Sequence, residues 1–254
     1  TEVTTMSAKN KKKLMPKLLL TVLILALAAL GLFLLSGRET STAEEPGNTG
    51  AAQETMPISE ILEQGSFIEV NEGLVITAAG NYTGIYMEDG SDDPVTGILK
   101  IHLTNISEEA IQYARITMNV DGEEALFTVT ALPAGATAVL LEQNRMEYRE
   151  DVDYMTLTAK CENLALFDKA LSLHEDKLQI QTLDGALNIT NVSGSDINGT
   201  IILCYKGWQN DMYYGGIAYR IKLEGGMKAG ELRQIMAEHY MEPGSRLVFV
   251  DIVE

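Results

Sequence analysis

ARITMNVDGEEALFTVTALPAG, residues Ala114–Gly135, contains two alternating runs of apolar and polar residues with a turn signal between them. Apolar and polar residues alternate over 114–120 and again over 127–130. A period of two is the pattern of a β-strand with one buried face. Asp121-Gly122 lies between the two runs and is typical of a tight hairpin turn. We therefore predict two antiparallel strands in this stretch.

The same alternation continues on both sides of this hairpin. It occurs over 98–104, where Leu99, Ile101 and Leu103 share one face, and over 155–159. Leu132-Pro133-Ala134-Gly135 predicts a further turn, into an apolar run over 136–141. Short strands with a turn every 8–12 residues or so indicate an antiparallel sandwich or barrel.

The second half of the chain repeats this plan. LTNIS at 103–107 recurs as ITNVS at 189–193, and Ala134-Gly135 recurs as Ala229-Gly230. Asn105 precedes its glycine by 30 residues and Asn191 by 39, and the longer spacing lies around 205–216. About 190 residues of strands are better divided into two sandwiches than enclosed in one.

This pattern of T-N-[IV]-S, a strand, a turn ending in Ala-Gly and a further strand resembles a known family. It is similar to the small immunoglobulin-like sandwiches on surface proteins of Gram-positive bacteria, in particular to the FxLYD-type repeats. The resemblance covers about 66–160 and 172–254. It implies an all-β fold of two tandem immunoglobulin-like antiparallel sandwiches, in a membrane-anchored and non-catalytic surface protein.

An apolar run, LLLTVLILALAALGLFLL at Leu18–Leu35, precedes the strands. At 1.5 Å per residue it is just long enough to cross a bilayer core about 30 Å thick. Five lysines precede it, whereas only Arg38 follows, so we expect a cytoplasmic N-terminus and an extracellular remainder. A cleaved signal peptide is the alternative. An uncleaved anchor in the cell membrane is favoured, because cleaved apolar regions are shorter and 36–38 is a poor cleavage site.

The predicted organisation therefore has five parts. They are a basic cytoplasmic tail over 1–17, a transmembrane helix over 18–37 that contacts the lipid bilayer, a disordered stalk over 38–57, a first β-sandwich domain over 58–165 with a short leading helix, and a second β-sandwich domain over 166–254. The stalk is predicted because its Thr, Glu, Gly and Ala give almost nothing apolar to bury.

The charge is strongly asymmetric along the chain. Residues 1–38 hold six Lys or Arg and one acid, so the following 216 residues hold 13 basic and 35 acidic residues, a net charge of −22. So acidic a surface repels phosphate backbones, which argues against a nucleic-acid partner. Solubility outside the cell is the simplest explanation of the acids, and binding of cations or a basic partner is the alternative.

The sequence contains no recognised catalytic or metal-binding motif. The three His are not at metal-ligand spacing, and Cys161 and Cys204 are expected to be separate buried thiols. In EDGSDD at 88–93, oxygen-bearing side chains at every second position have the spacing of calcium ligands in an EF-hand loop. However, Pro94 replaces the glycine that such a loop requires. A solvated hairpin tip is the default there, and an irregular weak calcium site is the alternative. We predict no enzyme activity, no cofactor and no metal site.

The most suggestive local feature is the aromatic cluster in YKGWQNDMYYGG at 205–216. It holds the single Trp and three of the ten Tyr. Flat rings beside Asn, Gln and Asp are typical of sugar- or protein-binding surfaces. We therefore predict Trp208, Tyr213 and Tyr214 as ligand contacts. The alternative is that Trp208 and Tyr205 cover one end of the second sandwich.

Together these observations predict a non-enzymatic cell-surface binding or scaffolding protein. Its partner would be an envelope protein, a glycan or a wall polymer. A structural subunit of a membrane complex, held through the transmembrane helix, is the alternative. An extracellular hydrolase with an unrecognised site is the third hypothesis, because no pair of acids has a spacing that identifies it.

Overall fold

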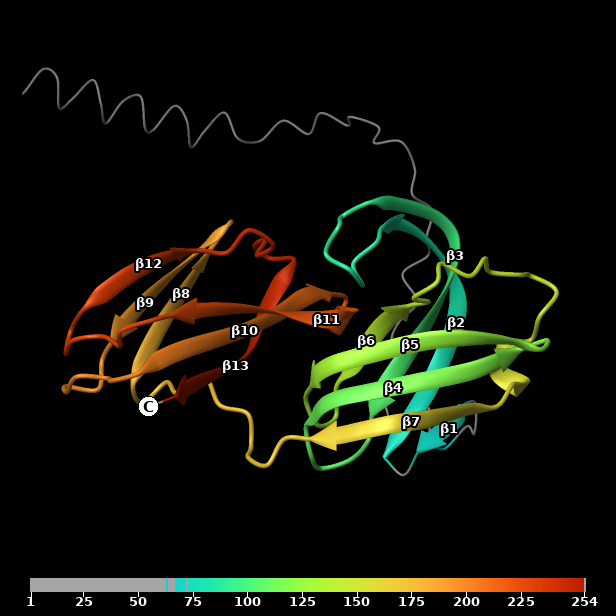
Figure 1. Cartoon of the computed structure of the whole chain (residues 1–254), viewed down its shortest axis with the longest axis horizontal. Coiled ribbons are helices and arrows are strands. Elements are labelled where there is room, and N and C mark those ends of the chain that lie inside the picture. The colour runs from blue at the N-terminus through green and yellow to red at the C-terminus, as the bar shows by residue number, and fades with distance from the viewer. Residues whose placement is uncertain (1–62, 64–66, 72, 254) are drawn as a thin grey trace, which may run out of the picture. The chain divides into compact units, whose positions relative to one another are not determined.

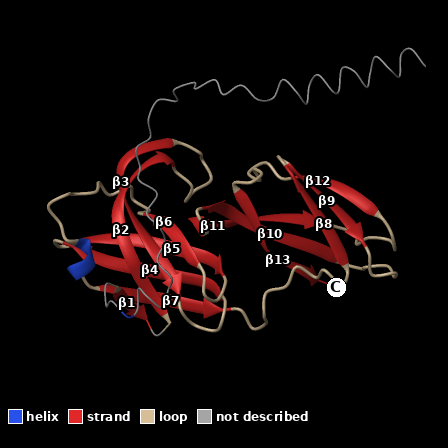
Figure 2. Cartoon of the chain, turned by 180° about the vertical axis from the view of Figure 1, so that it is seen from behind, coloured by secondary structure: helices blue, strands red, loops and turns tan. Residues whose placement is uncertain are grey.

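The computed structural model describes residues 63, 67–71 and 73–253. In this part the chain is built from strands and one short 3-10 helix, so the predicted all-β class is confirmed (Figure 2). The tail, the anchor, the stalk and, apart from Glu63, the leading helix lie outside the described residues. No helix among the described residues is long and apolar enough to cross a membrane.

The strands are labelled in chain order (Figure 1). The first seven are β1 (Ile68–Asn71), β2 (Leu74–Ile85), β3 (Pro94–Asn105), β4 (Ile111–Val120), β5 (Glu123–Leu132), β6 (Thr137–Leu141) and β7 (Ala159–Leu166), with the 3-10 helix η1 at Tyr154–Thr156 before β7. The other six are β8 (Leu178–Leu183), β9 (Ala186–Asn191), β10 (Thr200–Gln209), β11 (Met212–Leu223), β12 (Leu232–Met236) and β13 (Ser245–Val253). The prediction of a strand over 155–159 is wrong, because η1 occupies the first of these residues and β7 begins only at Ala159.

The described residues all belong to one compact unit, in which three sheets are present. The largest has the order β1-β2-β3-β6-β11-β10-β13, and the others are β12-β9-β8 and β5-β4-β7. We call β1 to β7 the first lobe and β8 to β13 the second lobe. The large sheet passes from one lobe to the other where β6 and β11 pair in parallel.

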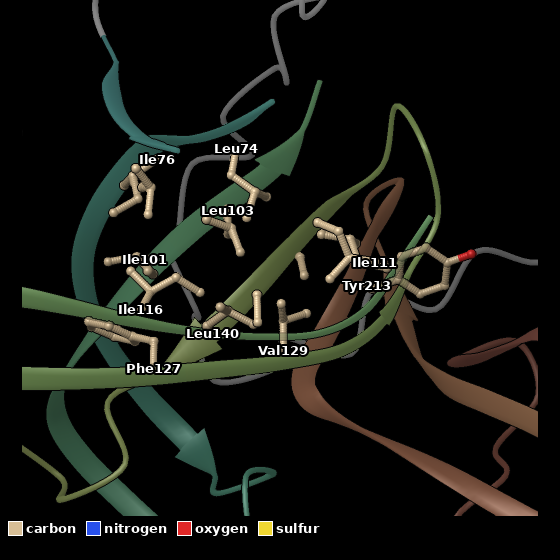
Figure 3. Packing of buried hydrophobic residues seen from close by; sticks show 14 of the residues in the cluster. Leu74, Ile76, Ile101, Leu103, Ile111, Ile116, Phe127, Val129, Leu140 and Tyr213 are labelled. Carbon is tan, nitrogen blue, oxygen red and sulfur yellow. The ribbon is translucent and has the colours of Figure 1, made fainter. Parts of the chain in front are cut away.

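Each lobe has its own apolar core. In the first, Ile76, Ile101 and Leu103 of the large sheet pack against Ile116 and Phe127 of the β5-β4-β7 sheet, and all five are fully buried (Figure 3). In the second, the core joins β8-β9-β12 to β11-β10-β13 through Leu187, Ile189, Ile201, Leu203 and Val250. The alternation seen in the sequence is the cause, because each strand turns its apolar face to the opposite sheet.

Two buried asparagines show that the lobes repeat one plan. The side-chain amide of Asn105 donates to the carbonyls of Glu109, Leu132 and Pro133, and its Oδ1 accepts from Ser107. In the second lobe the amide of Asn191 donates to the carbonyls at 195, 227 and 228, and its Oδ1 accepts from Ser193. Each asparagine therefore joins the end of one strand to the turn before another, and the predicted repeat is matched bond for bond.

Removing either asparagine side chain is expected to destabilise the protein. Asn105→Ala and Asn191→Ala each leave three carbonyls without their side-chain donor, and a buried unsatisfied polar group costs about 1–3 kcal/mol. We expect each variant to lose about 2–5 kcal/mol of unfolding free energy in urea titrations. The control is Asn163→Ala on the exposed side of β7, which should change it by less than about 0.5 kcal/mol. Variants as stable as this control would contradict the role assigned to the asparagines.

Candidate functional site

The predicted aromatic residues lie on a hairpin formed by β10 and β11. Asn210 and Asp211 form its turn, and both have positive φ angles, near 50° and 58°. Trp208 pairs with Tyr213 across the hairpin, and their rings meet edge to face with centroids 4.8 Å apart. The guanidinium of Arg246 lies 4.4 Å above the Trp208 ring, a cation–π contact. The hairpin thus brings two of the three predicted residues together.

The hairpin docks on the first lobe and is not an open loop. Tyr213 pairs with Ala138 and Tyr214 with Val139, in parallel register on β6. Tyr213 is only 5% exposed and belongs to the core of the first lobe, where Figure 3 draws its ring beside Ile111. Trp208 and Tyr214 are half-buried. The expectation of three rings exposed on a loop is therefore not met, since the extra residues of the second repeat join the two lobes.

Two buried ionisable side chains, Glu88 and Lys206, lie at the same junction, and both form hydrogen bonds with backbone groups of Gly216. We call them the buried pair, because the charge of each shifts the pKa of the other. The Glu88 carboxylate accepts hydrogen bonds from the N–H groups of Leu141 (2.8 Å) and Gly216 (2.7 Å). The Lys206 ammonium donates to the carbonyls of Thr130 (2.9 Å) and Gly216 (3.0 Å). Four strands and the loop before β3 are thereby connected through two side chains.

Burial moves both of these groups toward their neutral forms. Desolvation raises the pKa of Glu88 to about 7, although hydrogen bonds from Leu141 and Gly216 and the charge of Lys206 oppose the rise. Desolvation lowers the pKa of Lys206 to about 8, although the charge of Glu88 opposes the fall. Lys206 has no exposed surface, so a substrate in solvent cannot touch its Nζ. The pair therefore connects the lobes and does not have the exposure of a catalytic acid and base.

Sequence reasoning missed this pair. Lys206 follows the apolar run Ile201–Tyr205, and a charged residue that continues such a run was the available signal. Its carboxylate partner lies 118 positions earlier, in the loop that was considered for calcium. In that loop Asp89 and Asp93 lie 3.4 Å and 3.6 Å from Arg145, which already supplies a cation. No cluster of three or more His, Cys, Asp or Glu suited to a metal occurs among the described residues.

The second lobe presents a different kind of surface, the outer face of β8, β9 and β12. The register places nine side chains there in three cross-strand rows. The rows are Gln179-Thr190-Leu232, Gln181-Asn188-Gln234 and Leu183-Ala186-Met236. None of the nine is charged, although the protein as a whole has a net charge of −17. We call these nine residues the outer face.

A groove of about 610 Å³ includes part of the outer face and two further residues of β8. It is lined by Gln179, Ile180, Gln181, Thr182, Asn188, Thr190 and Leu232. Amide and hydroxyl side chains supply both hydrogen-bond donors and acceptors, and a ligand with mixed polar groups can satisfy both. In the first lobe the corresponding face is covered, because Tyr86, Val95 and Ile98 pack on Leu141. In the second lobe β8 and β9 meet in a short hairpin at Asp184-Gly185, and Leu232 and Met236 of the neighbouring β12 are exposed in the part of the chain that the structure describes.

Comparison of the chain with protein-family models, with curated proteins and with solved structures finds no match.

Proposed function

We propose that the chain is a non-enzymatic binding or scaffolding protein of the cell surface. In this proposal the helix predicted over 18–37 anchors it in the membrane, and two immunoglobulin-like sandwiches are displayed outside the cell. The observation that carries the proposal is the uncharged, amide-lined groove on the outer face of the second lobe. A concave surface with a few polar groups and an apolar flank is the usual form of a ligand site.

The junction supports the same function, with a role for the aromatic hairpin that differs from ligand contact. A binding surface is most useful when it is held at a fixed position on its support, because ordering on binding costs free energy. Strand pairing between β6 and β11 and the hydrogen bonds of Glu88 and Lys206 join the second lobe to the first. We propose that the first lobe supports the second and that the groove makes the ligand contacts.

The test is co-sedimentation of the full chain, solubilised in mild detergent, with isolated cell walls, because the predicted anchor would carry the chain down with membranes whatever the groove does. Gln181→Ala with Asn188→Ala removes two amides from the groove, and each lost hydrogen bond costs about 0.5–1.5 kcal/mol. We therefore expect binding to fall at least about fivefold. The matched control is Gln112→Ala with Asn163→Ala, which removes two exposed amides from β4 and β7 of the first lobe. This control should bind as the unaltered chain does.

The alternative function gives the opposite result. If the chain is a structural subunit held through its anchor, exchange of Leu18–Leu35 for an unrelated apolar helix abolishes the association and the groove variant leaves it intact. That outcome would overturn the binding function proposed for the groove.

A further inference from the structure

The repeat identifies β12 as the counterpart of β6. On β6, Thr137, Ala138 and Val139 pair with β3 residues that precede Asn105 by one, two and three positions. On β12, Leu232, Arg233 and Gln234 pair with β9 residues at the same distances before Asn191. The five residues of β12 therefore correspond one by one to the five of β6.

The two counterparts differ in what covers them. β6 is paired on both sides, with β3 and with β11, and four of its five side chains are buried. Among the described residues β12 is paired with β9 alone. Its apolar side chains Leu232 and Met236 are 62% and 72% exposed. An unpaired edge that carries exposed apolar side chains is a template for another strand.

The sequence of β12, Leu-Arg-Gln-Ile-Met, is complementary to itself when it runs antiparallel. With Gln234 opposite Gln234 of a second copy, Leu232 faces the second copy's Met236 on one side of the sheet and Arg233 faces its Ile235 on the other. No like charges oppose each other, because Arg233 is the strand's single charge and its Nε lies 2.7 Å from the Glu231 carboxylate. Apolar cross-strand pairs of this kind each contribute about 0.2–1 kcal/mol.

We propose that two copies of this chain associate through their β12 strands, antiparallel about a two-fold axis at Gln234. The association produces a six-stranded sheet in the order β8-β9-β12-β12-β9-β8. It satisfies the open backbone edge and covers the exposed Leu232 and Met236 at the same time. The uncharged outer face favours a second copy, because two acidic proteins can approach there without direct charge opposition. A five-residue contact is short, so the association is expected to be weak and reversible.

Cysteine cross-linking of the full chain in membranes tests the proposal and its register. The background is Cys161→Ser, while Cys204 is fully buried and is retained. Gln234→Cys places two cysteines opposite each other across the axis, with Cα atoms about 5 Å apart and therefore within disulfide reach. Leu232→Cys alone places its thiols four residues apart along the strand, about 13 Å, which is beyond that reach. In a mixture of Leu232→Cys chains and Met236→Cys chains, the cysteine of one variant lies opposite the cysteine of the other.

We therefore expect covalent dimer from Gln234→Cys and from the mixture, at least about fivefold above Leu232→Cys alone. Leu164→Cys on β7 is the control, since Leu164, like Gln234, is an exposed residue on an edge strand. Equal cross-linking of Gln234→Cys and Leu164→Cys would overturn the proposal. Cross-linking of Gln234→Cys to a different protein, with no dimer, would overturn it in favour of another occupant. Unchanged Trp208 fluorescence in each variant verifies that the fold is intact.

Discussion

Among Gly→Ala variants of the described residues, Gly216→Ala is expected to destabilise the lobe junction most. A Cβ at Gly216 would overlap the carbonyl oxygen of Thr128 and lie 2.7 Å from Oε2 of Glu88. The first of these atoms is backbone in the middle of β5 and cannot rotate away. Either β11 withdraws, which removes the hydrogen bonds of Glu88 and Lys206, or β5 distorts. We expect a loss of about 3 kcal/mol in unfolding free energy.

The measurement is urea unfolding of the full chain in mild detergent, followed by fluorescence. Trp208 is the single tryptophan and lies at the junction against Tyr213, so its emission reports on the docked hairpin. Gly80→Ala on β2 is the matched control, because a Cβ there meets only the Lys100 side chain at 3.6 Å, an ordinary contact. We expect the control to change stability by less than about 1 kcal/mol. Equal stability of the two variants would refute the close packing assigned to Gly216.

Local pattern in the sequence was sufficient for much of the fold. The alternation over 114–120 predicted β4 because its apolar face is buried, whereas Arg115 and Asn119 on the other face are not and Thr117 alone is buried there. Asp121-Gly122 predicted the turn of β4 into β5. The T-N-[IV]-S motif predicted the repeat because its asparagine bonds within a few residues and to one turn. The alternation and the hairpin turn depend on period and on neighbouring residues, and the motif itself is local although each asparagine also bonds to a turn 27 to 37 positions later.

The role of the aromatic hairpin depends on residues far apart in the sequence. The length difference between the repeats correctly located an insertion around 205–216, but its docking requires β6, more than 70 positions earlier. Asn210-Asp211 was a further local signal, because these residue types tolerate the positive φ of a tight hairpin turn. That signal would have placed Tyr213 and Tyr214 on a strand and not in a loop, although not against the first lobe.

The candidate groove was not predicted because its residues are individually ordinary. Gln181 and Asn188 form a surface only when β8 pairs with β9 in the observed register. That surface is exposed because the β8–β9 hairpin is short. The corresponding strands of the first lobe, β2 and β3, are longer, at 12 residues each. Short polar strands of this kind have no signature that distinguishes a binding face from a solvated one.

Removal of Lys206 is expected to have the other large effect, and its size should depend on pH. Lys206→Met leaves the Glu88 carboxylate buried without its cation, and breaking a buried pair costs about 3–5 kcal/mol. We expect this loss at pH 8, where Glu88 is ionised. At pH 5 the Glu88 carboxyl is protonated in the folded state, and the variant should lose less. The fluorescence-monitored urea titrations, repeated from pH 5 to pH 10, measure the difference between the two chains.

The direction in which the stability of the unaltered chain changes with pH follows from the two pKa shifts. Glu88 has its folded pKa raised to about 7, so the folded state binds more protons than the unfolded state between about pH 4.5 and 7, and the stability contributed by this group falls as pH rises through that window. Lys206 has its folded pKa lowered to about 8, so its contribution rises between about pH 8 and 10.5. The pair therefore contributes least between about pH 7 and 8.

Glu88→Gln is the reciprocal variant and separates the two windows. It leaves a buried lysine without its carboxylate, so its cost is expected to be largest between about pH 7 and 8. The cost should shrink toward pH 5, where Glu88 is protonated in the unaltered chain, and toward pH 10, where Lys206 is neutral. Lys206→Met with Glu88→Gln removes both charges, and replacement of a buried pair by uncharged side chains is often neutral or stabilising. The double variant should therefore be more stable near pH 7.5 than either single variant. Independent, additive losses would instead show that the two groups do not act as a pair, and that the junction is held by strand pairing alone.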